Sequence, residues 1–269
     1  DAGDRNRTSP FAFTGNKFEF RAVGSSQSVA GPNTVLNTIV AESLDFFATS
    51  LEKAVASGED LNSAIQKLLA KAVKEFKPIL FDGDNYSDAW KAEARKRGLP
   101  NLVSTIDCVP LATGKESISL FTKYGVYSER ELHSRQEILL EKYTRTVTIE
   151  ALTASVMAHT MILPAGLKYQ AAVAKAVNSA KQAGASDAAL AAMLKEIVKL
   201  NGSFRKAAIA MDRAVAGHSG GGALGHARHM HDKVLPAMAE LRTLGDKLEL
   251  IVDDSYWPLP TYREMLFIR

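Results

Sequence analysis

A long helical pattern in the second half of the chain is the feature that most constrains the fold. From about Val147 to Asp253 apolar residues recur at helical spacing, with breaks at Pro164, near Gly184 and across Gly217 to Gly222. Alanine-rich stretches between these breaks allow helices to approach closely. The pattern therefore predicts a helical hairpin or bundle with polar connectors.

Shorter helices are predicted upstream from the same spacing and from capping signals. Ser87 precedes one of them as a potential N-cap, and Ser128 is followed three residues later by Glu131, the spacing of a capping box. The segment from Leu99 to Ala112 has two prolines and no clear period, so it is predicted to be irregular. The predicted upstream helices run from Pro32 to about Ser57, from Leu61 to Phe76, from Ser87 to near Gly98, from Lys115 to Tyr124 and from Ser128 to Tyr143.

The N-terminal residues have the alternation of a strand instead. Lys17, Glu19 and Arg21 alternate with Phe18 and Phe20, so the charged and the aromatic side chains would point to opposite faces. An apolar run, Pro10 to Phe13, precedes a Thr-Gly-Asn turn signal. The predicted fold class is mainly α, with a short N-terminal antiparallel β ribbon followed by a helical bundle.

The charged face of this ribbon permits two interpretations. Cations fixed beside a carboxylate suit a metal-bound polyphosphate, because phosphoryl transfer depends on charge neutralisation and positioning. The same alternation is also typical of an ordinary half-exposed strand whose charged face is solvated. Spacing alone leaves both interpretations open.

Composition is that of a globular protein and does not indicate binding to nucleic acid or insertion into a membrane. The 269 residues can bury a substantial core, with 46% hydrophobic and 23% charged residues. The net charge of +3 is too small to indicate nucleic-acid binding. The single Cys108 excludes an internal disulfide. With no apolar run near the ~20 residues of a membrane span, we expect no membrane partner and a cytoplasmic location.

Several segments together resemble one enzyme family. Asn6-Arg7-Thr8-Ser9, followed by Lys17-Phe18-Glu19-Phe20-Arg21 and then Gly31-Pro32-Asn33, resembles the active-site strands and the following helix of glutamine synthetases. The longer N-terminal segment around these motifs and the C-terminal Trp257-Pro258-Leu259-Pro260-Thr261-Tyr262-Arg263 resemble the type III branch. The resemblance extends over essentially the whole chain.

The resemblance implies an ATP-dependent ligation of ammonia to glutamate through γ-glutamyl phosphate, with Mg²⁺ or Mn²⁺. It implies that Glu19 binds the metal, that Lys17 lies on the nucleotide side, and that Arg7 and Arg21 act on the phosphoryl group and substrate. Many relatives have a further arginine where this chain has Ala12, so the resemblance does not say how glutamate is held.

The resemblance also implies a domain organisation and an assembly. The chain is expected to be a C-terminal portion, in which residues 1–57 end the catalytic domain, with the ribbon in its sheet, and residues 58–269 form a helical extension. Family assembly implies a ring-type homo-oligomer, and the isolated chain is predicted to be inactive. The alternatives are a non-catalytic helical assembly or regulatory module and a related carboxylate–amine ligase.

Other candidate sites are interpreted as structural. His218, His226, His229 and His231 surround a glycine run and could share a metal, but their spacing favours a surface helix after a glycine loop. His159 is expected to be a packed helix residue. Cys108, in an apolar context, is expected to be buried and inert. The charges from Lys91 to Arg97 are expected to form a solvated helix face.

Overall fold

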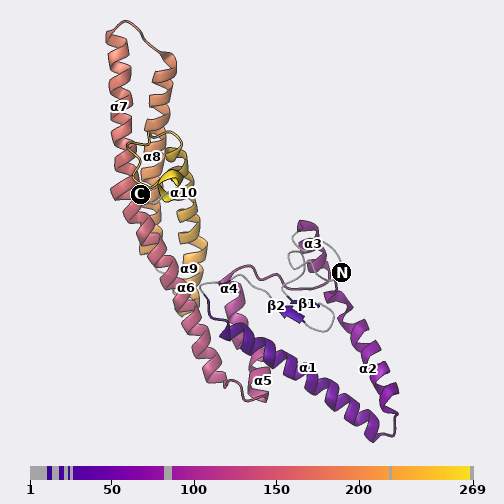
Figure 1. The fold of residues 1–269 in the computed structure, drawn as a ribbon. Coiled ribbons are helices and arrows are strands. Elements are labelled where there is room, and N and C mark those ends of the chain that lie inside the picture. Colours follow the sequence, from indigo (N-terminus) through magenta and orange to yellow (C-terminus); the bar gives the residue numbers. More distant parts are fainter. Residues whose placement is uncertain are drawn as a thin grey trace. The chain divides into compact units, whose positions relative to one another are not determined.

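The computed structural model of the chain describes residues 11–13, 18–20, 24, 27–81, 87–217 and 220–266 (Figure 1). The chain divides into two compact units, Asp1–Ser134 and Arg135–Arg269. Helices make up most of the described residues of both units.

The first unit consists of two very short strands and a series of helices. The helices α1 and α2 contact each other, as do α1 and α5. Its elements are β1 (Phe11–Phe13), β2 (Phe18–Phe20), α1 (Ala30–Ala56), α2 (Leu61–Phe76), the 3-10 helix η1 (Lys77–Ile79), α3 (Asp88–Lys96), α4 (Thr105–Cys108), the 3-10 helix η2 (Val109–Thr113) and α5 (Lys115–Lys123).

Local capping explains where several of these helices begin. The Asp60 carboxylate accepts a hydrogen bond from the Ser63 backbone N–H at 3.0 Å at the start of α2. Ser87 does the same for the N–H of Trp90 at the start of α3. The prediction of an irregular segment after Leu99 is wrong, because Ser104 caps the short helix α4 and η2 follows it directly.

The predicted fold class also needs correction. A helical bundle joined to a β sheet was expected, but β1 and β2 have only three residues each and pair only with one another. Among the described residues neither strand borders a third one, so there is no sheet to which a ribbon belongs. The remaining residues form two helical units instead of a single bundle. The described protein is therefore a helical one.

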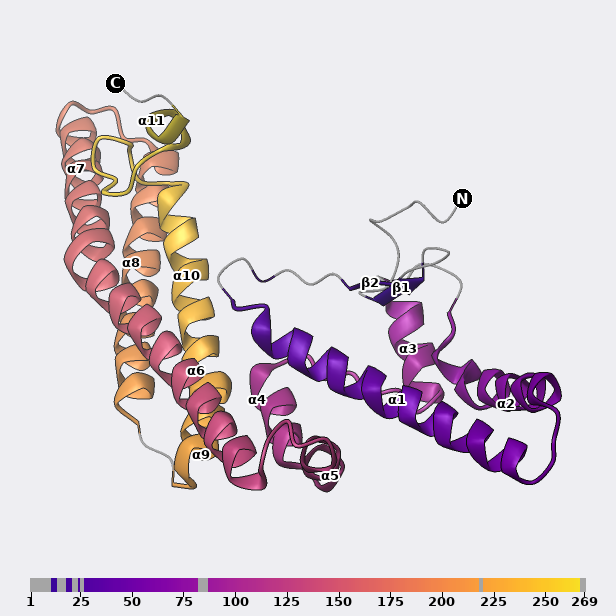
Figure 2. The same cartoon turned by 60° about the horizontal axis from the view of Figure 1, so that its bottom comes forward.

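The second unit is a bundle of long helices. In it α8 contacts both α7 and α10, and Figures 1 and 2 show these three helices side by side. The helix α6 begins in the last residues of the first unit and continues into the second. The elements are α6 (Glu129–Met157), the π-helix η3 (Ala158–Ile162), α7 (Leu163–Gln182), α8 (Ala188–Ala216), α9 (Gly222–His229), the π-helix η4 (Met230–Val234), α10 (Leu235–Glu249) and α11 (Tyr262–Leu266).

The core of the second unit lies between α8 and α10. Phe204 and Met211 of α8 and Leu248 of α10 are almost completely buried in it. A second cluster joins Val147 and Ala151 of α6 to η4. Burial of an apolar face on each helix is the main source of stability in such a bundle.

Both π-helices end two residues before a proline. Pro164 and Pro236 each stand in the first turn of the next α-helix, after η3 and η4 respectively. Proline lacks an N–H group and its ring clashes with the carbonyl four residues earlier, and a π-helical turn accommodates both effects. The predicted break at Pro164 is therefore wrong, because the helix passes through the proline by widening for one turn.

One helical stretch is both long and apolar. Glu129–Gln182 forms 54 continuous helical residues and contains an 18-residue window of mean hydropathy 1.3, of which 17% is buried. By length and composition it could cross a membrane, so the expectation that no stretch approaches this length needs correction. One such helix is weak evidence for insertion, because helices of soluble proteins meet the same criterion.

Candidate functional site

The predicted catalytic residues lie at the N-terminal end of the chain. Glu19 is the central residue of β2, and the antiparallel register places it opposite Ala12 of β1. Ala12, which stands where relatives have a further arginine, is therefore paired with Glu19, the candidate metal ligand. Arg7, Lys17 and Arg21 lie outside the described residues, so their roles stay predictions.

A metal site would need ligands beyond those that the structure describes. Within the described ranges, no group of three or more His, Cys, Asp or Glu side chains could hold an ion. Hard divalent cations such as Mg²⁺ and Mn²⁺ need several oxygen ligands. The described residues therefore do not form such a site by themselves, and Glu19 could supply only one ligand of a shared site.

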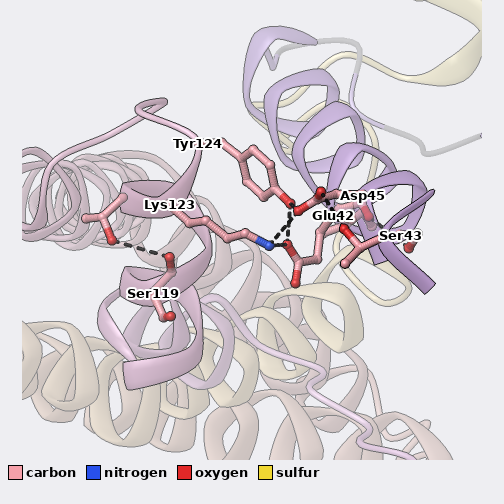
Figure 3. A network of polar contacts seen from close by, with 9 residues as sticks. Glu42, Ser43, Asp45, Ser119, Lys123 and Tyr124 are labelled. Atoms are coloured by element: carbon pink, nitrogen blue, oxygen red, sulfur yellow. Dashed lines mark hydrogen bonds and ion pairs between the residues drawn. The ribbon is translucent and has the colours of Figure 1, made fainter. Parts of the chain in front are cut away.

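A compact polar cluster joins α1 to the end of α5 (Figure 3). Lys123 Nζ lies 2.7 Å from Glu42 Oε2 and 2.8 Å from Asp45 Oδ2. The Tyr124 hydroxyl lies 2.5 Å from Glu42 Oε2 and 2.8 Å from Asp45 Oδ2, and its single hydrogen can be donated to only one of them at a time. Adjacent residues at the end of α5 thus hold two carboxylates that stand one helical turn apart.

Lys123 and the two carboxylates of this cluster favour one another's charged forms. Hydrogen bonds from Lys123 and then from Tyr124 lower the pKa of both Glu42 and Asp45 below their usual values. The two carboxylates in turn raise the pKa of Lys123. The charged forms of the two carboxylates and of the ammonium therefore favour one another, and both carboxylates are occupied by contacts with Lys123 and Tyr124. The arrangement fits a clamp between two helices.

A second polar contact joins η3 and α6 to α8. Ser155 Oγ donates to Asp212 Oδ1 at 2.6 Å, and His159 Nε2 lies 2.8 Å from Asp212 Oδ2. Partial burial works against the charged carboxylate, but the hydrogen bonds from Ser155 and His159 outweigh it and lower the pKa of Asp212. His159 thus makes a helix–helix contact, in line with its predicted structural role.

The histidine cluster does not form a metal site among the residues that the structure describes. His229 Nε2 donates to the carbonyl oxygen of Ala214 at 2.7 Å, which fixes the ring against α8. His231 Nδ1 lies 2.7 Å from the carboxylate of its neighbour Asp232. His218 lies outside the described residues. These contacts agree with the surface-helix interpretation.

An open cavity of about 440 Å³ lies beside the start of α9. Its walls combine glycine backbone with two cations, Arg228 and Lys233, and one carboxylate, Asp232. This mixed charge does not select an anionic or a cationic ligand.

Two further residues differ from their sequence predictions. Cys108 is exposed, because the segment around it forms α4 and η2 at the surface and its thiol points to the Leu102 carbonyl 3.4 Å away. Arg97 is not simply solvated: its Nη1 donates to the Leu80 carbonyl at 2.7 Å and its guanidinium lies 5.4 Å from the Trp90 ring centre. Trp90 also stacks on Phe81. Arg97 therefore holds the connection between α2 and α3.

Comparison with known proteins shows what the chain is similar to. Residues 64–181 match the family model of the glutamine synthetase C-terminal domain. A type-3 glutamine synthetase from Dictyostelium discoideum is 40% identical over 280 residues, an alignment that covers 100% of this chain and 37% of the relative. The chain is similar over its whole length to a C-terminal portion of glutamine synthetases. The resemblance seen in its sequence is thereby confirmed.

Other glutamine synthetases align in the same way. One from Bacteroides fragilis is 36% identical, with 100% of this chain and 38% of the relative covered. One from Butyrivibrio fibrisolvens is also 36% identical, with 99% and 38% covered. The chain thus spans less than two-fifths of the length of these glutamine synthetases, which agrees with its interpretation as a C-terminal portion.

Proposed function

We propose that the longer polypeptide to which this chain corresponds is a glutamine synthetase that ligates ammonia to glutamate. The reaction consumes ATP and passes through γ-glutamyl phosphate, from which ammonia displaces phosphate. The alignment with named glutamine synthetases over 99–100% of the chain carries this proposal, because it includes the N-terminal segment with the predicted site residues.

Each predicted site residue has a role in this proposal. Arg7 and Arg21 offset the charge of the transferred phosphoryl group, and Lys17 binds the nucleotide. Glu19 contributes one carboxylate to a divalent cation, Mg²⁺ or Mn²⁺, whose other ligands come from outside the described residues. Bound ATP supplies the phosphoryl group that activates the glutamate carboxylate.

The organisation of the polypeptide is part of the same proposal. Residues 1–57 complete the catalytic domain, and residues 58–269 form a helical extension. The protein acts in the cytoplasm as a ring-type homo-oligomer, with glutamate and ammonia as substrates and without nucleic-acid or membrane partners. The family relationship supports oligomeric assembly in general, and the ring is the specific form proposed here.

Phosphate release from ATP tests the activity directly. The intact polypeptide is assayed with glutamate and ammonium each supplied or withheld, and release that requires both supports glutamine synthesis. Glu19→Ala should lower the rate by at least about 100-fold, whereas Glu52→Ala, at an exposed position of α1, should leave it unchanged. Release without joint dependence on both substrates, or none from a folded protein with Mg²⁺ or Mn²⁺, would refute the proposal.

The isolated 269-residue chain should be inactive in the same assay. One carboxylate cannot assemble a metal site, and the described residues contain no further group of ligands. Activity of the isolated chain would contradict the assignment of the catalytic domain to a longer polypeptide. If an amine other than ammonia competes better in the intact enzyme, a related carboxylate–amine ligase becomes the better description.

A further inference from the structure

The helix α1 has no charged side chain in its first turns. The 20 residues from Ala22 to Ala41 contain no Asp, Glu, Lys or Arg, and the first 12 residues of α1 belong to this segment. The first two charged residues of the helix, Glu42 and Asp45, are both held by Lys123. A helix at a protein surface has charged or polar side chains facing the solvent, and a helix that is apolar on several sides is typical of a protein interior.

Apolar side chains of α1 are nevertheless exposed on the sides without charge. Val35, Ile39, Val40 and Leu44 expose between 42% and 64% of their surface, and we name these four residues the α1 apolar surface. In contrast, Thr38 of the same helix is only 4% exposed. Contiguous exposed apolar surface of this kind marks an interaction site.

The two helices that pack on α1, α2 and α5, leave this surface open. The helix α5 contacts Glu42 and Asp45, whereas Val40 and Leu44 stand one turn apart on a different side of α1. The 16 residues of α2 extend about 24 Å, compared with about 40 Å for the 27 residues of α1. Because α2 follows the end of α1, it is too short to run along the first turns, where Val35 lies.

We propose that in the intact polypeptide the α1 apolar surface is covered by the part of the same polypeptide that precedes this chain. The proposal rests on the domain organisation in the proposed function, in which residues 1–57 complete the catalytic domain. It deepens that assignment because it names the surface through which α1 packs on the rest of the domain.

The length of the relatives shows how much polypeptide can cover this surface. The alignments include 37% of the Dictyostelium discoideum protein and 38% of the Bacteroides fragilis protein, so about three-fifths of each relative lies outside them. The aligned part is a C-terminal portion, so that length precedes it in the relatives. A segment of this size is large enough to form a domain with its own core.

Covalent connection favours this occupant over a second copy. Only nine residues separate Phe20, at the end of β2, from Ala30, at the start of α1, and such a segment spans at most about 36 Å. Polypeptide that precedes the two strands therefore stays near the α1 apolar surface. A short covalent connection corresponds to an effective concentration in the millimolar range, which a separate copy does not reach at ordinary protein concentrations.

The α1 apolar surface also determines the chemistry of the segment that covers it. A charged segment would lose its hydration there without gaining an ion pair, because the surface contains no charged group. The covering segment is therefore apolar, like the core of a domain.

Hydroxyl-radical footprinting read by mass spectrometry tests whether the surface is covered. Val40 and Val55 are matched reporters, because both are valines of α1 and they are 46% and 47% exposed. In the 269-residue chain the two should be oxidised at similar rates. In the intact polypeptide oxidation of Val40 should fall at least about tenfold relative to Val55, because close packing excludes the radical. An unchanged ratio would overturn the proposal.

Photocrosslinking identifies the segment that covers the surface. Benzoylphenylalanine replaces Leu44 in the intact polypeptide, and isotopically light and heavy subunits are assembled together before irradiation. Cross-links to the preceding part within subunits of one label support the proposal. Cross-links between light and heavy subunits would assign the surface to a second copy and overturn it. The same replacement at Val35 provides a second variant when the first impairs folding.

Phosphate release separates this proposal from the proposed activity. If Val40 is protected but phosphate release does not depend jointly on glutamate and ammonium, the surface assignment stands and the activity is refuted. If Val40 is unprotected in a polypeptide that makes glutamine, only the surface assignment is refuted.

Discussion

Replacement of Gly166 by alanine should loosen the contact between α7 and α8. Asn201 of α8 is only 4% exposed, and its Nδ2 donates to the Gly166 carbonyl and to Gln170 Oε1, both at 3.0 Å. A Cβ on residue 166 would lie 2.3 Å from Asn201 Oδ1 and 3.2 Å from its Cγ. Such a distance is impossible for non-bonded atoms, so the Asn201 side chain would have to turn away.

The energetic cost follows from what Asn201 loses. Turning away breaks two hydrogen bonds and leaves buried polar groups unsatisfied, at about 1–3 kcal/mol each. Alanine regains about 1 kcal/mol over glycine inside a helix. The free energy of unfolding of the second unit should therefore fall by about 1–5 kcal/mol.

Urea denaturation followed by Trp257 fluorescence measures this effect in a Trp90→Phe background. Trp257 belongs to the second unit, packs against its core and donates to Glu249 at 3.1 Å. In an Asn201→Ala background the obstruction is gone, so Gly166→Ala should be neutral or stabilise by up to about 1 kcal/mol. If Gly166→Ala lowers the free energy of unfolding equally in both backgrounds, the clash with Asn201 is not the cause of the destabilisation.

Three other substitutions test the polar contacts. Lys123→Met should remove the clamp and speed hydrogen exchange of the α5 amides, more at low salt than at high salt; equal exchange with and without the lysine would contradict the clamp. Because the pKa of Asp212 is lower in the folded than in the unfolded protein, its ionised carboxylate stabilises the fold. This stabilisation is complete at pH values above the unfolded-state pKa of about 3.9, and it is lost as the pH falls through the folded-state pKa. The stability gap between wild type and Asp212→Asn should therefore narrow from about pH 6 to about pH 3, and a constant gap in urea denaturation would exclude this linkage. Ser128→Ala should cost about 1 kcal/mol, because Ser128 and Glu131 form a reciprocal cap at the start of α6, and thermal unfolding at neutral pH measures it.

Local signals in the sequence were sufficient for many helix boundaries. The prediction of a helix from Leu61 to Phe76 is confirmed at both ends, since a capping aspartate precedes it and a proline follows it closely. The reciprocal cap of Ser128 and Glu131 is also present. Such features depend on residues within one turn of each other, which is the range that periodicity and capping rules describe.

Features that depend on distant residues were not predictable in this way. Lys123 and Glu42 are 81 residues apart, and nothing in either local sequence indicates that α5 approaches α1. Glu42 and Asp45 stand one turn apart on α1, which is the only local signal for the clamp. The exposure of Cys108 likewise depends on tertiary packing and not on its apolar neighbours.

The predicted catalytic site depends on another kind of information. Strand alternation left Glu19 and its neighbouring cations ambiguous, and only similarity to a family gave them roles. The structure adds the register of Ala12 opposite Glu19. The roles themselves await the phosphate-release assay.

The π-helical turn at Ala158–Ile162 has a geometric consequence for the long helix that contains it. Each residue of an α-helix advances the side chains by about 100° around the axis, so one extra residue in a turn rotates everything beyond it by about that angle. The two halves of the 54-residue stretch therefore present different sides to their surroundings. Side chains that share one face of α6 are therefore continued by side chains on a different face of α7. A straight element packed along that face of α6 would lose contact with it near Pro164.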